Sequence, residues 1–123
     1  MMAVANSLCF TQLIEFEVAP LRQHALAHAL AARSERLAFE HAGLLGISVQ
    51  ASDDGSRVLQ YLQWQSRSDW EAAIGSFDQE PFLDLLREHL ARGVNFSAFQ
   101  TLSSLARTAE GGLHCQVAPH QTL

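Results

Sequence analysis

Gln60, Trp64 and Trp70 are the side chains whose types and spacing best suit chemistry on a ligand. In a strand, Gln60 and Trp64 share one face and lie about 13 Å apart, at ~3.3 Å per residue. Trp70 follows in the first turns of a predicted helix. A carboxamide can orient a polar group, and two indoles supply flat apolar walls that carry N–H donors. The set indicates a pocket for a flat molecule; the alternative is that the tryptophans only pack in the core.

The histidines give no clear sign of a metal site. His24 and His28 stand four residues apart on a predicted helix, but no third ligand accompanies them. We interpret them as solvated side chains. His41 and His89 fall at predicted helix ends, where a protonated imidazole complements the helix dipole. The sequence therefore predicts no bound metal.

Hydrophobic periodicity predicts the elements that would position these residues. Alternation with period two indicates strands, and apolar stripes with a period near 3.6 indicate helices. The order is strand, helix, strand, strand, helix, strand, over residues 8–18, 20–41, 44–52, 57–65, 66–90 and 94–105, with the second helix interrupted at 75–81. This order predicts an α+β, ferredoxin-like β-α-β-β-α-β fold, with an antiparallel four-stranded sheet and the helices on one face.

Local signals mark where these elements begin and end. Residues 53–56 form a turn motif between two strands. Ser66, with Asp69 three residues later, resembles a capping box at a helix start. Gly43 is expected to end the first helix in the left-handed conformation, and Gly93 to close the second.

Both faces of the predicted sheet carry large apolar side chains. One face contains Phe10, Phe16, Trp64 and Phe96, and the other Leu13, Leu59, Tyr61 and Phe99. The helices cover only one of these faces, so the second needs another partner. A second copy of the chain is the simplest one, and we predict a homodimer whose sheets face each other.

Composition narrows the class of protein further. The chain has 123 residues, of which 48% are apolar and 17% charged, and a net charge of −5. An acidic chain suits neither nucleic acid nor an anionic membrane surface. No apolar run is long enough to span a bilayer, and the two cysteines lie far apart. We expect a cytoplasmic protein with one domain over residues 1–107 and a tail, 108–123, that is flexible or packed on the partner subunit.

The hairpin and the helix start that follows it resemble a known family. The run Asp54–Ser66, followed by Asp69 and Trp70, is similar to the antibiotic biosynthesis monooxygenase family. The nearest likeness is to small cofactor-independent oxygenases of aromatic polyketide pathways, and the element order agrees over residues 8–105. The resemblance implies a dimeric α/β barrel with one pocket per chain. It also implies oxidation of a polycyclic phenol, of anthrone or naphthacenone type, to a quinone by O2 as co-substrate, without a cofactor.

The resemblance also implies roles for individual residues. The family's pocket amide falls on Gln60, its strand tryptophan on Trp64 and its helix tyrosine on Trp70, which we predict to be catalytic. A pocket histidine falls on Gln50, and a helix arginine in a Leu-Arg-Glu run falls on Arg87. These two are predicted to bind substrate, the aromatic small molecule.

Alternatives remain open at this point. Tryptophan and glutamine replace the family's tyrosine and histidine at positions 70 and 50, which favours a non-catalytic dimer that binds a small molecule on the same fold. A haem-degrading enzyme would need His89 as axial ligand and Gln12 as the first-strand amide; both are included among the predicted substrate-binding residues. Finally, the protein's own side chains could fill the pocket.

Overall fold

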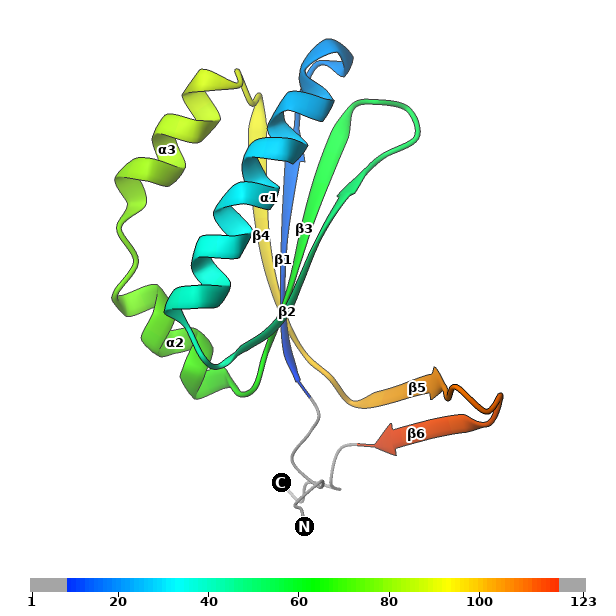
Figure 1. Cartoon of the computed structure of the whole chain (residues 1–123). Coiled ribbons are helices and arrows are strands. Elements are labelled where there is room, and N and C mark those ends of the chain that lie inside the picture. Colours follow the sequence, from blue (N-terminus) through cyan, green and yellow to red (C-terminus); the bar gives the residue numbers. More distant parts are fainter. Residues whose placement is uncertain (1–8, 118–123) are drawn as a thin grey trace.

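The computed structural model describes residues 9–117, in which all helices lie on one face of a four-stranded antiparallel sheet (Figure 1). The strand order is β2-β3-β1-β4. In chain order the elements are β1 (Phe10–Glu17), the 3-10 turn η2 (Pro20–Arg22), α1 (Gln23–Glu40), β2 (Leu44–Ala51), β3 (Arg57–Trp64), α2 (Arg67–Gly75), α3 (Gln79–Glu88), β4 (Gly93–Gln100), β5 (Ser103–Arg107) and β6 (Leu113–Val117). The predicted ferredoxin-like fold is confirmed, with the second helix divided into α2 and α3.

The core lies between the sheet and α1. The even-numbered residues of β1 and β3 face the helices, and the register pairs Phe16 with Val58. Both of these side chains are completely buried, as are Leu26 and Leu30 on α1. Leu26 and Leu30 are four residues apart and so share one face of the helix. The alternation seen in the sequence therefore corresponds to one packed layer between sheet and helix.

Helix α3 reaches the sheet through the ring of Phe82. The Phe82 ring centroid lies 6.0 Å from that of Phe16 on β1 and 6.0 Å from that of Phe96 on β4. Phe77, in the link between α2 and α3, lies 6.1 Å away in an edge-on arrangement. These separations are typical of favourable aromatic pairs. One aromatic cluster thus connects two strands with the α2–α3 segment.

The turn between β2 and β3 is held by the Asp54 carboxylate. It accepts hydrogen bonds from the Ser56 backbone N–H and from the hydroxyls of Ser52 and Ser56. These bonds, led by the backbone one, lower the pKa of Asp54 from 3.8 to about 2. The ionised carboxylate therefore supports this turn above about pH 4, and the support is lost as the pH falls through about 2. Gly55 adopts the positive φ of 81° that the turn requires.

The predicted start of α2 is confirmed, but the predicted roles of Gly43 and Gly93 are wrong. The Ser66 hydroxyl oxygen accepts a hydrogen bond from the Asp69 N–H at 3.1 Å, as in a capping box. Helix α1 ends at Glu40, and Gly43 has no positive φ. A Cβ atom on Gly43 would lie 2.5 Å from the Asp69 Cγ, so glycine is needed there for space. After α3 it is Leu90, with φ 53°, that takes the left-handed conformation.

The chain leaves the sheet earlier than its sequence pattern indicates. Strand β4 ends at Gln100, the partner of Phe10 at the end of β1. The next residues form β5 and β6, an antiparallel hairpin that projects from the sheet (Figure 1). The predicted strand end near Leu105 is therefore wrong, because the alternation in the sequence continues after β1 can no longer pair. The described part of the predicted tail, residues 108–117, forms the turn and the second strand of this hairpin, and its packing on a partner subunit stays a prediction. The hairpin crosses the expected domain boundary at residue 107.

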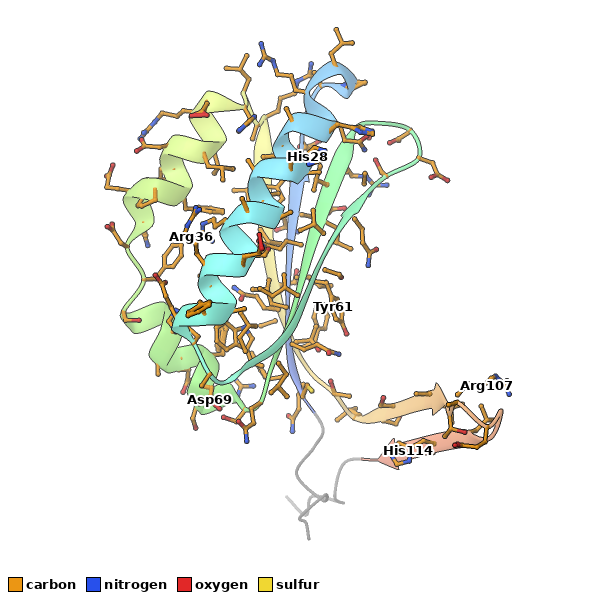
Figure 2. The ribbon with its side chains drawn as sticks, viewed as in Figure 1. His28, Arg36, Tyr61, Asp69, Arg107 and His114 are labelled. Carbon is orange, nitrogen blue, oxygen red and sulfur yellow. The ribbon has the colours of Figure 1, made fainter. Side chains whose placement is uncertain are left out.

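The second face of the sheet carries no helix. Tyr61 points to this side, away from α1 (Figure 2). Leu13 pairs with Tyr61 across β1 and β3, and Leu59 lies on the same face. Phe99, on the edge strand β4, is 51% exposed. Within residues 9–117, no helix is long and apolar enough to cross a membrane.

Shortening a core side chain on α1 tests this packing. We expect Leu30→Ala to lower the free energy of unfolding by about 2–5 kcal/mol, because it leaves a cavity at a fully buried position. Leu21→Ala is the control, since Leu21 is 99% exposed, and its expected effect is below about 0.5 kcal/mol. Urea denaturation followed by circular dichroism measures both. Equal effects would contradict the assignment of the core.

Candidate functional site

A cavity of about 380 Å³ lies between the sheet and the three helices. Most of its lining is apolar or aromatic, with polar groups at intervals. The apolar lining residues are Ile14, Leu37, Leu62, Trp64, Trp70, Ala73, Ile74, Phe77, Phe82, Leu83, Leu86, Val94 and Phe96; the polar ones are Gln12, Arg33, His41, Gln60 and Gln79. A space of this size and composition is typical of small-molecule sites. The protein's own side chains therefore do not fill this pocket, in contrast to the alternative considered from the sequence.

Gln60 presents an unpaired acceptor to this cavity. The side chain is fully buried, and its Nε2 donates to Ser34 Oγ at 3.0 Å. The Ser34 hydroxyl donates its hydrogen to the Leu30 carbonyl at 2.8 Å, so Oγ can only accept from Gln60. This relation fixes which end of the amide is free. Oε1 is buried and has no partner among the described residues, and a ligand hydroxyl that reached it from the cavity would satisfy it.

Trp70 presents an unpaired donor. Its indole Nε1 is buried and has no hydrogen-bond partner within residues 9–117. Its ring packs on Phe10, with the centroids 4.9 Å apart, and Arg67 covers that phenylalanine, its guanidinium carbon 4.8 Å from the ring centroid. Buried donors without partners are costly in a folded protein. Acceptor and donor thus line one cavity, where a molecule carrying a hydroxyl and a carbonyl could satisfy both.

Trp64 and Gln12 form a pair on neighbouring strands. The Trp64 Nε1 donates to Gln12 Oε1 at 3.3 Å, and Trp64 is 4% exposed. The Trp64 ring also contacts His41, edge-on, with centroids 5.9 Å apart. His41 follows α1 as its C-cap residue and is half-buried. The helix-end position was expected from the sequence, whereas its place in the cavity wall was not.

Arg33 is the cavity residue that sequence reasoning missed most clearly. It is 8% exposed, and its guanidinium lies 4.8 Å from the centroid of Phe77 and 5.0 Å from that of Phe82. Burial, and then the nearby Arg36, lower the pKa of Arg33. A signal existed in the sequence: Arg33 continues the buried stripe of Leu26 and Leu30 at helical spacing.

The structure separates the remaining predicted residues from the cavity, contrary to expectation. Gln50 lies on the open face of the sheet and donates to Ser48 Oγ, because it pairs with Leu59 rather than with an inward residue. Arg87 is on the outer side of α3, where it pairs with Asp84 at 2.8 Å. His89 follows α3 as its C-cap residue and does not line the cavity. The haem-degrading alternative needed His89 and Gln12 at one site, and only Gln12 is there.

Other ionisable groups form no recognisable centre in the described part of the chain. His24 and His28 are exposed on α1. No group of three or more histidine, cysteine, aspartate or glutamate side chains within residues 9–117 is placed to hold a metal ion. Arg33 and His41 are the ionisable side chains of the cavity wall as described.

Comparison with known sequences identifies one family. The sequence model of a family described as antibiotic biosynthesis monooxygenase matches residues 9–84. A tetracenomycin-F1 monooxygenase from Streptomyces glaucescens is 32% identical over 78 residues, which are 63% of this chain and 70% of that protein. The match contains β1 to β3, α1, α2 and part of α3, and so most of the cavity wall.

Comparison with solved structures agrees with this result. A monooxygenase from the gene ActVA-Orf6 of Streptomyces coelicolor, in complex with nanaomycin D, is 26% identical with a TM-score of 0.60. The alignment covers 80% of this chain and 93% of that one. A dimeric ferredoxin-like protein from an uncultured marine organism is 11% identical with a TM-score of 0.66, over 85% and 96% of the two chains, and supports the fold.

Replacing Gln60 tests whether its amide serves stability or a ligand. We expect Gln60→Leu to change the free energy of unfolding by less than about 1 kcal/mol, since Oε1 is unpaired and Ser34 keeps its bond to Leu30. Leu62→Ala on the same strand is the control, with an expected loss of about 2–5 kcal/mol. Chemical denaturation measures both. A large loss in Gln60→Leu would show that the amide is mainly structural.

Proposed function

Because this chain belongs to the antibiotic biosynthesis monooxygenase family, we propose that its cavity binds a polycyclic phenol, of anthrone or naphthacenone type, and oxidises it to a quinone with O2 and no cofactor. The observation that carries the proposal is the pair of unpaired buried groups, Gln60 Oε1 and Trp70 Nε1, on residues of a mainly apolar cavity with several aromatic walls. Such a cavity fits a flat molecule with a hydroxyl and a carbonyl. The tetracenomycin-F1 monooxygenase supports the choice of a polyketide-type substrate.

The first part of the reaction needs an ionised phenol. A second hydroxyl of the substrate donates to Gln60 Oε1, and the proton of the reacting hydroxyl passes to a base in the cavity. The phenolate then transfers one electron to O2, giving a phenoxyl radical and superoxide. The protein contributes binding and exclusion of water, with Trp64 and Trp70 as flat walls.

The second part forms the new carbonyl. The radical pair combines at a ring carbon that carries hydrogen, and the peroxide takes back the proton held by the base. The hydroperoxide then loses the remaining hydrogen of that carbon while its O–O bond breaks, and water leaves. One oxygen atom of O2 is in the quinone and the other in water, whose two hydrogens come from the phenol hydroxyl and from the ring carbon. The conversion of one C–OH and one ring C–H into two C=O groups is therefore balanced.

His41 is the base that the cavity wall offers. An imidazole exchanges a proton near neutral pH, which the other ionisable lining group, a guanidinium, does not. The contact between the His41 and Trp64 rings places it beside the predicted wall. In this proposal His41 takes the phenol proton and returns it to the peroxide.

A second candidate is a protein of the same fold that binds a small molecule without turning it over. It is favoured by the tryptophan at position 70, because an indole donates a hydrogen bond but exchanges no proton near neutral pH. In that case Gln60 and Trp70 would bind the ligand's polar groups, and O2 would have no role.

Oxygen consumption separates the two candidates. The protein is supplied with a panel of anthrones and naphthacenones in air, with a chelator present and with flavin excluded by its absorbance. We expect one O2 consumed per quinone formed, and a fall in kcat/KM of roughly 10-fold in Gln60→Leu, because one hydrogen bond that orients the substrate is lost. Trp64→Phe keeps the wall but loses the indole N–H and is the milder variant. Tight binding of these phenols without O2 uptake would select the binding protein instead.

The role of His41 has its own test. We expect His41→Gln to lower kcat by roughly 100-fold or more, with KM little changed, because a proton acceptor is lost while the wall is kept. His28→Gln, at an exposed position of α1, is the matched control and should leave both constants unchanged. Steady-state kinetics of quinone formation measures them. An unchanged kcat in His41→Gln would remove the imidazole from the mechanism.

We also propose that the chain forms a homodimer through the open face of its sheet. The apolar side chains there, including the half-exposed Phe99, lack a helix to cover them. The marine ferredoxin-like neighbour is described as dimeric, which supports this arrangement.

Charge on the open face tests the dimer. Light scattering after size-exclusion chromatography should give twice the chain mass for the protein and the chain mass for Phe99→Asp. Phe39→Asp on α1, at a side chain that is 95% exposed, should leave the dimer intact. A monomeric wild-type protein would contradict the proposal.

A further inference from the structure

We propose that Arg33 binds the ionised oxygen of the ligand, so that the cavity selects phenols that bind as phenolates. The inference rests on the proposed function, because it names the form of the substrate that the same cavity takes. It starts from a buried cation. Arg33 is 8% exposed, and no carboxylate oxygen lies within 4.0 Å of its guanidinium in the described part of the chain. A cation removed from water without a counter-ion is unfavourable unless a ligand supplies one.

The aromatic contacts leave the donors of Arg33 free. Its guanidinium lies over the rings of Phe77 and Phe82, which line the same cavity. Contacts between a guanidinium and ring faces do not use its N–H donors in conventional hydrogen bonds. No hydrogen bond occupies these donors among the described residues, and Arg33 is one of the residues that line the cavity. Arg33 is therefore oriented by α3 and its preceding link, and is available to an anion.

The charges around the cavity favour a negative guest. The wall contains Arg33 and His41 and no aspartate or glutamate, although the chain as a whole has a net charge of −5. Arg36 on α1 adds positive charge near Arg33, and Glu40 only partly opposes it. A cation in an apolar site stabilises a phenolate far more than it would in water. The cavity is therefore expected to prefer a planar polycyclic molecule with an acidic hydroxyl over the methyl ether of that molecule.

A stable coloured phenol tests this without any turnover. The probe is 2-hydroxyanthraquinone, which is already oxidised and whose phenolate absorbs at longer wavelength, and its partner is 2-methoxyanthraquinone. Absorbance titration gives the pKa of the bound probe. We expect the protein to lower that pKa by about one unit or more, equivalent to a tenfold preference for the phenolate. Arg33→Gln should abolish the shift, and Arg33→Lys should restore part of it.

Two comparisons separate anion binding from a structural role of Arg33. Arg22→Gln, at an exposed arginine in the turn before α1, should keep the shift in the probe's pKa. Affinity for the methoxy probe should be the same in the wild-type protein and in Arg33→Gln. Equal weakening of both probes in Arg33→Gln would mean that Arg33 only holds the wall, and would overturn the inference.

Different results would contradict the role of Arg33 and the proposed function. An unshifted probe pKa in a protein that still oxidises anthrones would overturn the role of Arg33 alone. If neither probe binds and no phenol is oxidised, both proposals fall.

Discussion

The hydrogen bonds that run from Gln60 through Ser34 to the Leu30 carbonyl determine what the cavity can do. They join the sheet to α1 at buried positions. Because the Ser34 hydroxyl donates its hydrogen to Leu30, its oxygen can only accept, and the amide nitrogen of Gln60 is the end that can donate to it. The carbonyl oxygen of the Gln60 side chain is therefore the end of the amide that has no partner among the described residues. An acceptor in a fixed direction at a dry site is the kind of group that enzymes use to orient a hydroxyl.

Strand alternation made the fold predictable, because one face of a half-buried sheet must be apolar at every second residue. Phe16 and Val58 followed this rule and lie opposite each other in the core. The rule failed where strand pairing, rather than the alternation of apolar residues, decides the structure. Alternation continues beyond Gln100, yet no part of β1 remains to pair with it. Gly43 was interpreted from its type alone, whereas its place depends on Asp69, a residue distant in the sequence.

The sequence predicted those residues of the candidate site that lie on the inward face of the strands. Gln12, Gln60 and Trp64 stand at even-numbered positions of β1 and β3. Alternation of side chains along a strand therefore predicts that they share the inward face. Gln50 was placed by resemblance, and the register of β2 directs it outward. Arg33 could not be assigned from the sequence, because an arginine in an apolar helix stripe becomes a site only when the facing elements supply rings and no acid. The structure alone supplies those facing elements.

The aromatic cluster around Phe82 has a consequence for access to the cavity. The Phe82 ring connects α3 to β1 and β4, and Trp70 on α2 packs on Phe10 of β1, while the sheet and α1 are joined by a continuous apolar layer. A segment that is held to the sheet by side-chain contacts, with no backbone hydrogen bonds of a strand pair, can tilt while the hydrogen-bonded sheet stays intact. Arg33 rests on the Phe82 ring, so a tilt of this segment would expose the guanidinium to water. Ligand entry and hydration of the Arg33 guanidinium would then occur together.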